Sequence, residues 1–410
     1  MKLSSAGAPH LTYCTNIHPG ETWGEIRQNL EQHVRAVKQR VMPDGPFGVG
    51  LRLSAVAARE LARPEELEAF RDWLAREQLY VFTINGFPYG PFHGTRVKEA
   101  VYLPDWFDEE RVRYTEELGG ILAALLPDGM TGSVSTVPGA FRPRVTSRAD
   151  ADRMANNLLR VAASFHELRA STGKLVRLAV EPEPFCYFET TDETVRFFEE
   201  HLLALEALDR YGAMTRLAPG REETSLRRHL GVCFDACHMA VEFEDPREGP
   251  RRFEAAGIGI YKVQLSAGLD AELADDGEAA RSLARFIDDV YLHQVVEKRD
   301  GAEIVRYLDL PEALATVATV NPPAARRRHF RVHFHVPIFR EALGPFRNTQ
   351  AYLRELLALQ REEPVSDHLE VETYTWDVLP AEYRTEGVAS AVARELQWVR
   401  GELEGPRGGG

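Results

Sequence analysis

Short apolar runs alternate with longer amphipathic helical patterns along nearly the whole chain, and this alternation constrains the fold more than any other feature. The runs show no polar face, which is typical of a parallel sheet covered by helices. Such a sheet is either an open doubly wound sheet or a closed (β/α)8 barrel. The candidate strands are 11–16, 47–53, 79–84, 132–136, 176–181, 231–235, 258–264, 331–336 and 369–375.

The helical pattern is clearest between strands four and five. Apolar residues at positions 154, 158, 161, 165 and 168 recur every three or four residues, which predicts one buried helix face. Ser147 and Asp150 precede this face, and Gly173 follows it where a glycine commonly ends a helix.

The absence of a phosphate-binding glycine motif favours the barrel. No G-x-G-x-x-G or G-x-x-x-x-G-K-[ST] pattern opens a helix, so the usual signature of nucleotide-binding doubly wound sheets is missing. A single barrel domain over residues 1–404 is therefore predicted, with an insertion of about 270–330 and a disordered tail at 405–410. The sequence offers nine candidate strands for a barrel of eight, so either 331–336 or a neighbouring run lies outside the barrel.

Composition limits the binding partners and the cellular compartment that are expected for this chain. A formal net charge of −14 argues against a nucleic-acid partner, and no apolar stretch is long enough to insert into a membrane. Four cysteines and the lack of a signal peptide favour a cytoplasmic protein. A small molecule is the expected partner, and the sequence leaves open whether the chain forms a homo-oligomer.

Polar residues gather where strand after strand ends, which is where barrel enzymes place their chemistry. His333 and His335 would share one face of a strand, as would Glu370 and Glu372. Carboxylates, imidazoles and an amide oxygen converging on the barrel axis would suit Mn²⁺, Mg²⁺, Co²⁺ or Zn²⁺. The candidate residues are His18, Asn85, Glu181, Glu183, Asp235, His238, Lys262, Gln264, His333, His335, Glu370 and Glu372.

Plainer interpretations exist for several of these residues. A single strand-end glutamate is often a surface acid, a His-x-His pair can be a hydrogen-bonded core pair, and Glu370 and Glu372 could face solvent. Lys262 could form a Schiff base or pair with an acid inside the barrel. The coincidence of so many such residues at one end of successive strands favours a functional site.

The segment Asp235-Ala-Cys-His238-Met resembles the sixth strand of ketose 3-epimerases in the xylose-isomerase-like superfamily, and Glu181-Pro182 resembles the end of their fifth strand. The resemblance implies that Glu181 and Asp235 bind a metal ion and that His238 contacts substrate. It also implies that Glu372 or Glu370 acts as both ligand and acid–base group. The histidine of their seventh strand is replaced by Gln264, unless His333 or His335 takes its place.

A second resemblance spans more of the chain. The segments LTYCTNIHPGETW (11–23), TINGFPYG (83–90), VHFHVPIF (332–339) and LEVETYTWDVLP (369–380) resemble the EboE family of metabolite-traffic proteins. That family is a sugar-phosphate-isomerase-like barrel encoded beside a UbiA-like prenyltransferase, a TatD-like hydrolase and a dehydroquinate-synthase-like cyclase. The resemblance implies a cyclitol or keto-sugar intermediate of a secondary-metabolite pathway.

The leading hypothesis is a divalent-metal-dependent isomerase or epimerase of a keto-sugar, sugar phosphate or cyclitol, in which Glu181 removes a proton and Glu372 returns it. The alternatives are a hydrolase of the endonuclease IV-like branch and a non-catalytic protein that binds a metabolite. The expected catalytic residues are Glu181, Glu372 and His238. The expected metal ligands are Glu181, Asp235, Gln264, His335 (or His333) and Glu372 (or Glu370). The expected substrate contacts are His18, Asn85, Glu183, His238, Lys262, His333 and Glu370.

Overall fold

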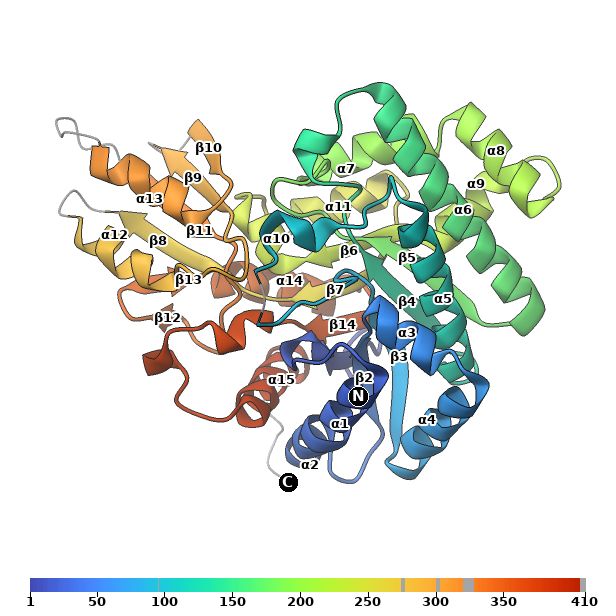
Figure 1. The fold of residues 1–410 in the computed structure, drawn as a ribbon, viewed down its shortest axis with the longest axis horizontal. Helices are drawn as coiled ribbons and strands as arrows, with labels where there is room; N and C mark the ends of the chain where they lie inside the picture. The colour runs from blue at the N-terminus through green and yellow to red at the C-terminus, as the bar shows by residue number, and fades with distance from the viewer. Residues whose placement is uncertain (95, 274–276, 300–302, 320–327, 406–410) are drawn as a thin grey trace.

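Eight parallel strands form a nearly closed barrel, as the sequence predicted (Figure 1). The computed structural model describes residues 1–94, 96–273, 277–299, 303–319 and 328–405, so most of the tail predicted at 405–410 lies outside the described residues. The strands are hydrogen-bonded in the order β1-β14-β7-β6-β5-β4-β3-β2. They are β1 (His10–Tyr13), β2 (Phe47–Arg52), β3 (Leu79–Asn85), β4 (Thr131–Thr136), β5 (Leu175–Val180), β6 (Leu230–Asp235), β7 (Ile260–Leu265) and β14 (His368–Val371).

The barrel closes between β1 and β2 through a side chain as well as through the backbone. Cys14 and Gly50 form a parallel bridge, and the Thr12 hydroxyl donates to the carbonyl of Gly48 at 2.7 Å. The same hydroxyl oxygen accepts from the N–H of Gly50 at 3.0 Å. Thr12 therefore replaces part of the backbone ladder at the last seam of the barrel.

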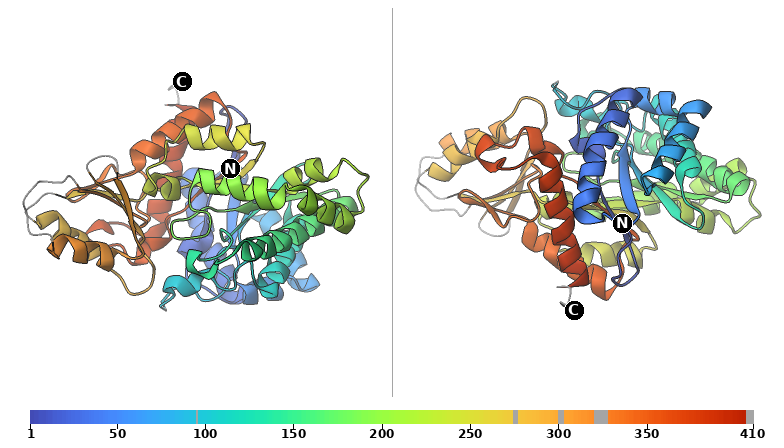
Figure 2. Two further views of the ribbon diagram at one scale, coloured as in Figure 1. Left: turned by 90° about the horizontal axis from the view of Figure 1, so that it is seen from above. Right: turned by 90° about the horizontal axis from the view of Figure 1, so that it is seen from below.

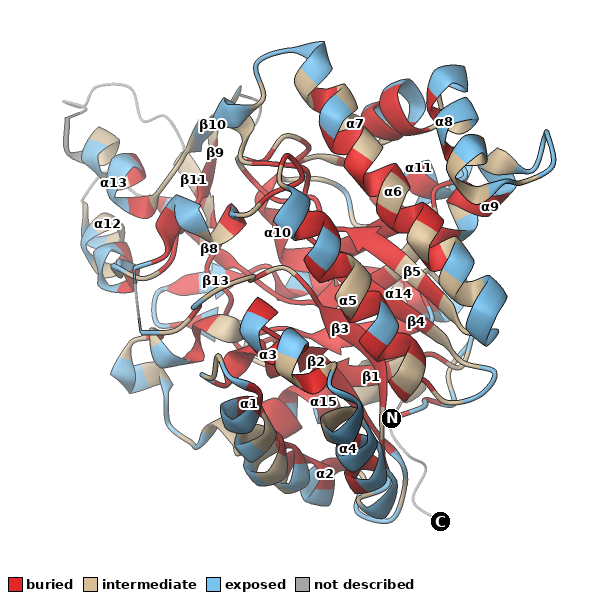
Figure 3. Cartoon of the chain, turned by 45° about the vertical axis from the view of Figure 1, so that its right-hand side comes forward, coloured by how far each residue is buried: buried red, intermediate tan, exposed pale blue. Residues whose placement is uncertain are grey.

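Helices cover the outside of the barrel, with their outer faces exposed and the strands buried beneath them (Figure 3). None of the helices in the described ranges combines the length and apolar character needed to cross a membrane. The covering helices are α1 (Trp23–Asn29), α2 (Arg35–Val41), α3 (Ala55–Leu61), α4 (Pro64–Arg76), α5 (Glu109–Leu125), α6 (Arg148–Thr172), α7 (Thr191–Phe197), α8 (Leu205–Thr215), α9 (Glu222–His229), α10 (Ala236–Val241), α11 (Glu248–Ala255), α14 (Gln350–Glu362) and α15 (Val388–Glu404).

The helix α6 has the ends that its sequence predicts. The Ser147 hydroxyl accepts from the N–H of Asp150, and the Asp150 carboxylate accepts in return from the N–H of Ser147, which makes a capping box. Gly173 follows the last turn with φ of 74°, a left-handed conformation that glycine adopts without strain.

The chain between β7 and α14 leaves the barrel and forms a second, antiparallel sheet, which stands to one side of the barrel (Figure 2). The candidate strand 331–336 is corrected here, because residues 328–332 form a strand of this second sheet. The excursion spans 269–348 and is longer than the expected 270–330. Its elements are β8 (Leu269–Leu273), α12 (Glu278–Leu283), β9 (Val295–Arg299), β10 (Glu303–Tyr307), α13 (Leu310–Thr319), β11 (Arg328–Val332), β12 (Ala342–Leu343) and β13 (Phe346–Asn348).

Ion pairs join the second sheet to the loops at the mouth of the barrel. Arg306 on β10 pairs with Glu242, which follows α10, and with Glu189 in the loop after β5 at 3.1 Å. Lys98, in the loop after β3, pairs with Asp309 at 2.7 Å. The excursion therefore holds the loops that surround the C-terminal ends of the strands.

Candidate functional site

Three carboxylates from three strand ends meet at the mouth of the barrel. Glu181 follows β5, Asp235 ends β6, and Glu372 follows β14; one oxygen of each lies within 4.8 Å of the others. All three side chains are buried. Glu181 Oε2 and Asp235 Oδ2 have no hydrogen-bond partner among the described residues. Unpaired carboxylates are costly to bury, so this arrangement is suited to a cation.

The protonation of these carboxylates reflects their crowding. Burial raises the pKa of Glu181 well above its ordinary value, and the charges of Glu372 and Asp235 raise it further. Burial, Asp235 and Glu370 raise the pKa of Glu372 to about 8. Two neighbouring carboxyl groups can therefore hold a proton near neutral pH, as acid–base catalysis requires.

His335 is oriented as a metal ligand. Its Nδ1 lies 2.8 Å from the backbone carbonyl of Glu372, so this nitrogen carries the proton and Nε2 presents a lone pair. The Nε2 atom is buried without a partner among the described residues, and His335 forms a possible ligand group with Asp235 and His238. Gln264 lies in register between Asp235 on β6 and Glu370 on β14, and both atoms of its amide are likewise unpartnered. This donor set of carboxylates, imidazole and amide fits a divalent ion.

Two asparagines orient Glu372. The Nδ2 atoms of Asn16 and Asn85 donate to Glu372 Oε1 at 2.7 Å and 3.0 Å. Asn85 ends β3 and Asn16 follows β1, so residues distant in sequence hold one carboxylate oxygen. The other oxygen, Oε2, is left to bind an ion or to carry a proton.

Lys262 and Glu370 lie below this group as a fully buried ion pair, with Lys262 Nζ 2.6 Å from Glu370 Oε1. The ammonium group also donates to the hydroxyl of Ser135 at 3.3 Å. Burial alone would lower the pKa of Lys262, but Glu370 acting together with Cys233 and Cys14 outweighs burial and raises that pKa. Schiff-base chemistry needs a neutral amine, so this lysine does not serve that role.

A pair of imidazoles forms the wall beside the carboxylates. His238 Nδ1 lies 2.8 Å from the carbonyl of Pro182, and His333 Nδ1 lies 2.8 Å from Oε1 of Gln294. Both Nδ1 atoms therefore donate, and the two Nε2 atoms face each other at 3.1 Å. This pair can share one proton or accept from a hydroxyl group. Together with Glu183 it also forms a second possible ligand group.

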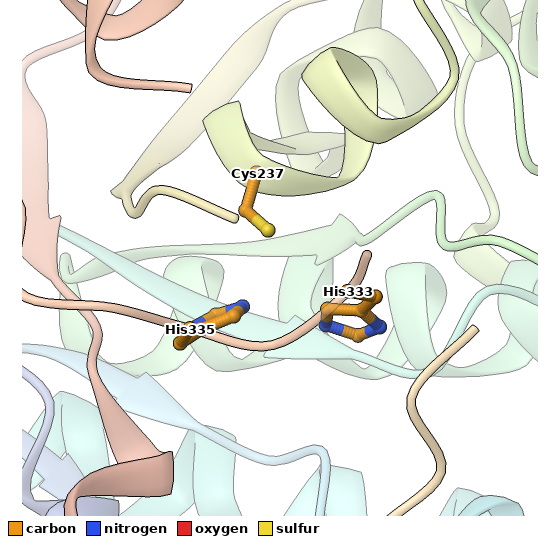
Figure 4. Close-up of side chains that lie close together, drawn as sticks. All are labelled: Cys237, His333 and His335. Carbon is orange, nitrogen blue, oxygen red and sulfur yellow. The ribbon is translucent and has the colours of Figure 1, made fainter. Parts of the chain in front are cut away.

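His333 and His335 reach the site by a different route from the one predicted. The strand β11 ends at Val332, so the two histidines follow the strand and alternation along it does not place them. The irregular segment returns to the barrel mouth beside the start of α10, where Cys237 lies close to both imidazoles (Figure 4). Burial and Asp235 raise the pKa of the Cys237 thiol well above its usual range, and this thiol forms a further possible ligand group with the two imidazoles.

A cavity opens above these groups, and about 40 Å³ of it can hold the centre of a water molecule. Of the predicted residues, Asn85, Glu181, Glu183, His238, His333 and Glu372 line it. Asp235, Gln264, His335, Lys262 and Glu370 are buried but are not among its lining residues. His18 lies apart, with its ring stacked on His33 at 4.2 Å and bonded to the hydroxyl of Tyr13.

Reasoning from strand ends missed two polar residues of this wall. The Tyr102 hydroxyl donates to Glu183 Oε1 at 2.7 Å, and Gln294 Nε2 donates to the Tyr102 oxygen at 2.7 Å. Tyr102 comes from the loop after β3, and Gln294 precedes β9 of the excursion. Neither lies at the end of a barrel strand, so no pattern in the sequence marks them.

Comparisons with known proteins give likenesses of fold only. No family model and no curated protein matches the chain. Among similar solved structures is a xylose isomerase-like TIM barrel protein from Mycobacterium smegmatis in complex with magnesium, with TM-score 0.49, 13% identity and coverage of 98% of each chain. L-ribulose 3-epimerase has TM-score 0.46 and 11% identity, covering 97% of this chain and 94% of the other. The probable 3-DHS dehydratase AsbF from Bacillus anthracis has TM-score 0.45 and 13% identity, covering 95% and 97%.

Proposed function

We propose that this protein is a divalent-metal-dependent isomerase or epimerase that acts on a keto-sugar, sugar phosphate or cyclitol. The observation that carries the proposal is the convergence of Glu181, Asp235 and Glu372, with the unpartnered Nε2 of His335, beneath a cavity. A buried group of three acids and one correctly oriented imidazole fits an ion better than it fits any structural role.

Glu181, Asp235, His335 and Glu372 would hold the ion, with the amide oxygen of Gln264 as a further ligand or as a partner of these side chains. When bound, a divalent ion polarises a carbonyl group and makes the neighbouring C–H bond more acidic. Manganese, magnesium, cobalt and zinc all accept this mixture of oxygen and nitrogen donors.

Glu181 and Glu372 are the proposed acid–base groups. Their carboxylate oxygens approach within 4.8 Å, and both line the cavity where a substrate carbon would lie. Glu181 removes the proton next to the carbonyl group. Glu372, whose Oε1 is held by Asn16 and Asn85, returns a proton through Oε2 on the same or the opposite face.

The wall of the cavity supplies the proposed substrate contacts. His238 and His333 accept from a substrate hydroxyl through Nε2, and Glu183 accepts from a second hydroxyl. Asn85 contributes indirectly by holding Glu372. Lys262 and Glu370 serve as a buried counter-charge below the site, and His18 is outside the cavity, so we omit these three from the proposed contacts.

We further propose that the chain is an EboE-like protein of a secondary-metabolite pathway. This proposal is supported by the four segments at 11–23, 83–90, 332–339 and 369–380. All four carry side chains of the site or its wall, namely Asn16, Asn85, His333, His335 and Glu372, so the resemblance is concentrated where the chemistry is.

A metal-dependent hydrolase is the second candidate, and one observation favours it. Hydrolases of the endonuclease IV-like branch hold several ions with many histidines. The excursion brings His333 and His335 to His238 and Glu183, which gives the site more nitrogen donors than the strand ends alone provide.

Exchange of substrate protons with solvent tests the proposal. The metal-loaded protein is incubated in D₂O with keto-sugars, cyclitols and their phosphates, and deuterium in the recovered compounds is measured by mass spectrometry. Glu181→Gln, which keeps the shape but cannot act as a base, should slow exchange by about 10²–10⁴-fold. Glu68→Gln, at an exposed position of α4, is the matched control. Cleavage without exchange would establish the hydrolase, and binding without either would establish a carrier.

A further inference from the structure

The cavity has two unlike parts. One part of its lining, which we call the floor, carries the carboxylates and imidazoles of the proposed site, whereas another part is built from apolar and aromatic side chains. We call this second part the apolar roof. It comes from the loop after β3, from the excursion and from the segment after β14, and it consists of Phe92, Val97, Val101, Tyr291, Leu292 and Tyr374.

The apolar roof is a packed unit, separate from the main core. Phe92, Val97 and Tyr291 form their own buried cluster, with Tyr374 packed against it. The Phe92 ring lies 5.1 Å from that of Tyr291 and 5.4 Å from that of Tyr374. Tyr374 also lies 4.6 Å from the ring of His335, so the roof continues directly into the floor. A ligand on the floor therefore extends against an ordered apolar surface.

The only lysine or arginine among the described lining residues has no proton to offer a ligand. Lys98 Nζ donates to the carbonyl oxygens of Asp288 at 3.1 Å and Tyr291 at 2.6 Å, and to Asp309 Oδ2 at 2.7 Å. An ammonium group has three donors, so all three are used. Phosphoryl groups are normally bound by arginine, by lysine or by a helix N-terminus.

The charge of the floor works against an anionic ligand as well. Glu181, Glu183, Asp235 and Glu372 are all buried there, and the buried lysines Lys98 and Lys262 are already paired with Asp309 and Glu370. One divalent ion would offset part of this charge and would leave nothing for a phosphate at the far end of the cavity.

We infer that the substrate is an uncharged hydroxylated carbonyl compound whose far end is an apolar ring or chain, and that phosphorylated compounds are excluded. This inference rests on the proposed function, because it assigns the hydroxylated carbonyl end to the floor. It narrows that proposal by removing sugar phosphates. Specificity then comes from the apolar roof, where transfer of an apolar group from water favours binding.

Three hydroxamates that share one metal-chelating end test the inference. Acetohydroxamate ends in a methyl group, benzohydroxamate in a phenyl ring and phosphoglycolohydroxamate in a phosphate. Binding to the full-length protein is measured by calorimetry with and without Mn²⁺. Benzohydroxamate should bind at least about tenfold more tightly than acetohydroxamate because the ring is buried against the roof. Phosphoglycolohydroxamate should bind more weakly than acetohydroxamate.

A variant reverses the preference if the inference is correct. Val101→Lys places an ammonium group on the half-buried wall. The affinity for phosphoglycolohydroxamate should therefore rise about tenfold, while the affinity for benzohydroxamate should fall. Val56→Lys, at a 43% exposed position of α3 outside the cavity, is the matched control and should change none of the three. The wild-type order of affinities stands as a test even if Val101→Lys fails to fold.

The outcomes separate the inference from the function on which it rests. Tightest binding of phosphoglycolohydroxamate to the wild-type protein would overturn the inference and leave the metal site intact. Benzohydroxamate binding that does not require Mn²⁺ would uphold the apolar roof and reject the metal-dependent function. Failure of all three to bind would reject both.

Discussion

Binding of a divalent ion should strengthen steeply as pH rises, because the ion must displace a proton from Glu372. The pKa of this carboxyl group is raised to about 8 in the metal-free protein by burial, Asp235 and Glu370. At about pH 6 the pH lies two units below that pKa, so displacing the proton weakens binding by about 50-fold relative to pH 8 and by about 100-fold relative to still higher pH. Glu181, whose pKa is also raised, would steepen the dependence further.

The raised pKa of Glu372 also makes the stability of the metal-free protein depend on pH. The pKa of Glu372 is higher in the folded chain than in the unfolded chain, so its favourable contribution is complete below about pH 4.5. That contribution is lost as pH rises through about 8. A difference of about 3.5 units corresponds to about 5 kcal/mol at most. The metal-free protein should therefore lose stability between about pH 5 and pH 8, and the ion should restore it.

Calorimetric titration of Mn²⁺ in paired buffers of different ionisation enthalpy measures both the affinity and the number of protons released. At least one proton per ion is expected at about pH 7. Glu372→Gln should remove the part of the pH dependence that comes from Glu372, whereas Glu68→Gln on the surface of α4 should leave the pH dependence unchanged. An affinity that is the same at about pH 6 and pH 8, with no proton release, would refute the assignment of Glu372 as a buried ligand.

Two further changes test the barrel around the site. Lys262→Met leaves Glu370 as an unpaired buried charge and should lower the free energy of unfolding at neutral pH by about 3–5 kcal/mol, measured by urea titration. Adding Glu370→Leu should recover much of this loss. If the losses of the two single variants simply add up in the double variant, the ion pair is contradicted. Gly50→Ala should lower the free energy of unfolding by about 1–3 kcal/mol in the same titration, because its Cβ would overlap both the Glu370 carboxylate and the backbone carbonyl of Tyr13. The control is Gly120→Ala on α5, where a Cβ meets nothing within 4 Å, and it should leave the stability unchanged or raise it.

The barrel itself was predictable because its evidence is local. Each parallel strand is buried on both sides, so it appears in the sequence as an apolar run, and each covering helix has its own periodic face and caps. The helix that ends at Gly173 shows this directly. The sequence left open whether the candidate at 331–336 was the strand outside the barrel, since an apolar run in an antiparallel sheet of the excursion has the same local pattern as a barrel strand.

The carboxylates of the site were also accessible from the sequence. Because parallel strands all end at one mouth, Glu181, Asp235 and Glu372 had to lie near the same axis once the strands were placed. The choice between Glu370 and Glu372 needed the structure. Both side chains point into the barrel, and only the contacts show that Glu370 pairs with Lys262 while Glu372 is held by Asn16 and Asn85.

What the chain by itself determined was therefore the class of fold and the acids at its mouth, since both follow from short-range periodicity and from strand direction. The tertiary structure alone decided the rest of the site. His335 and Gln294 reach the mouth from an excursion whose path depends on distant packing, including the Arg306–Glu242 ion pair. The ion pair between Lys98 and Asp309 leaves no free ammonium group among the described residues that line the cavity, and it depends on two loops about 200 residues apart. Contacts of that range leave no periodic trace in a single sequence, because any residue of suitable chemistry could satisfy them.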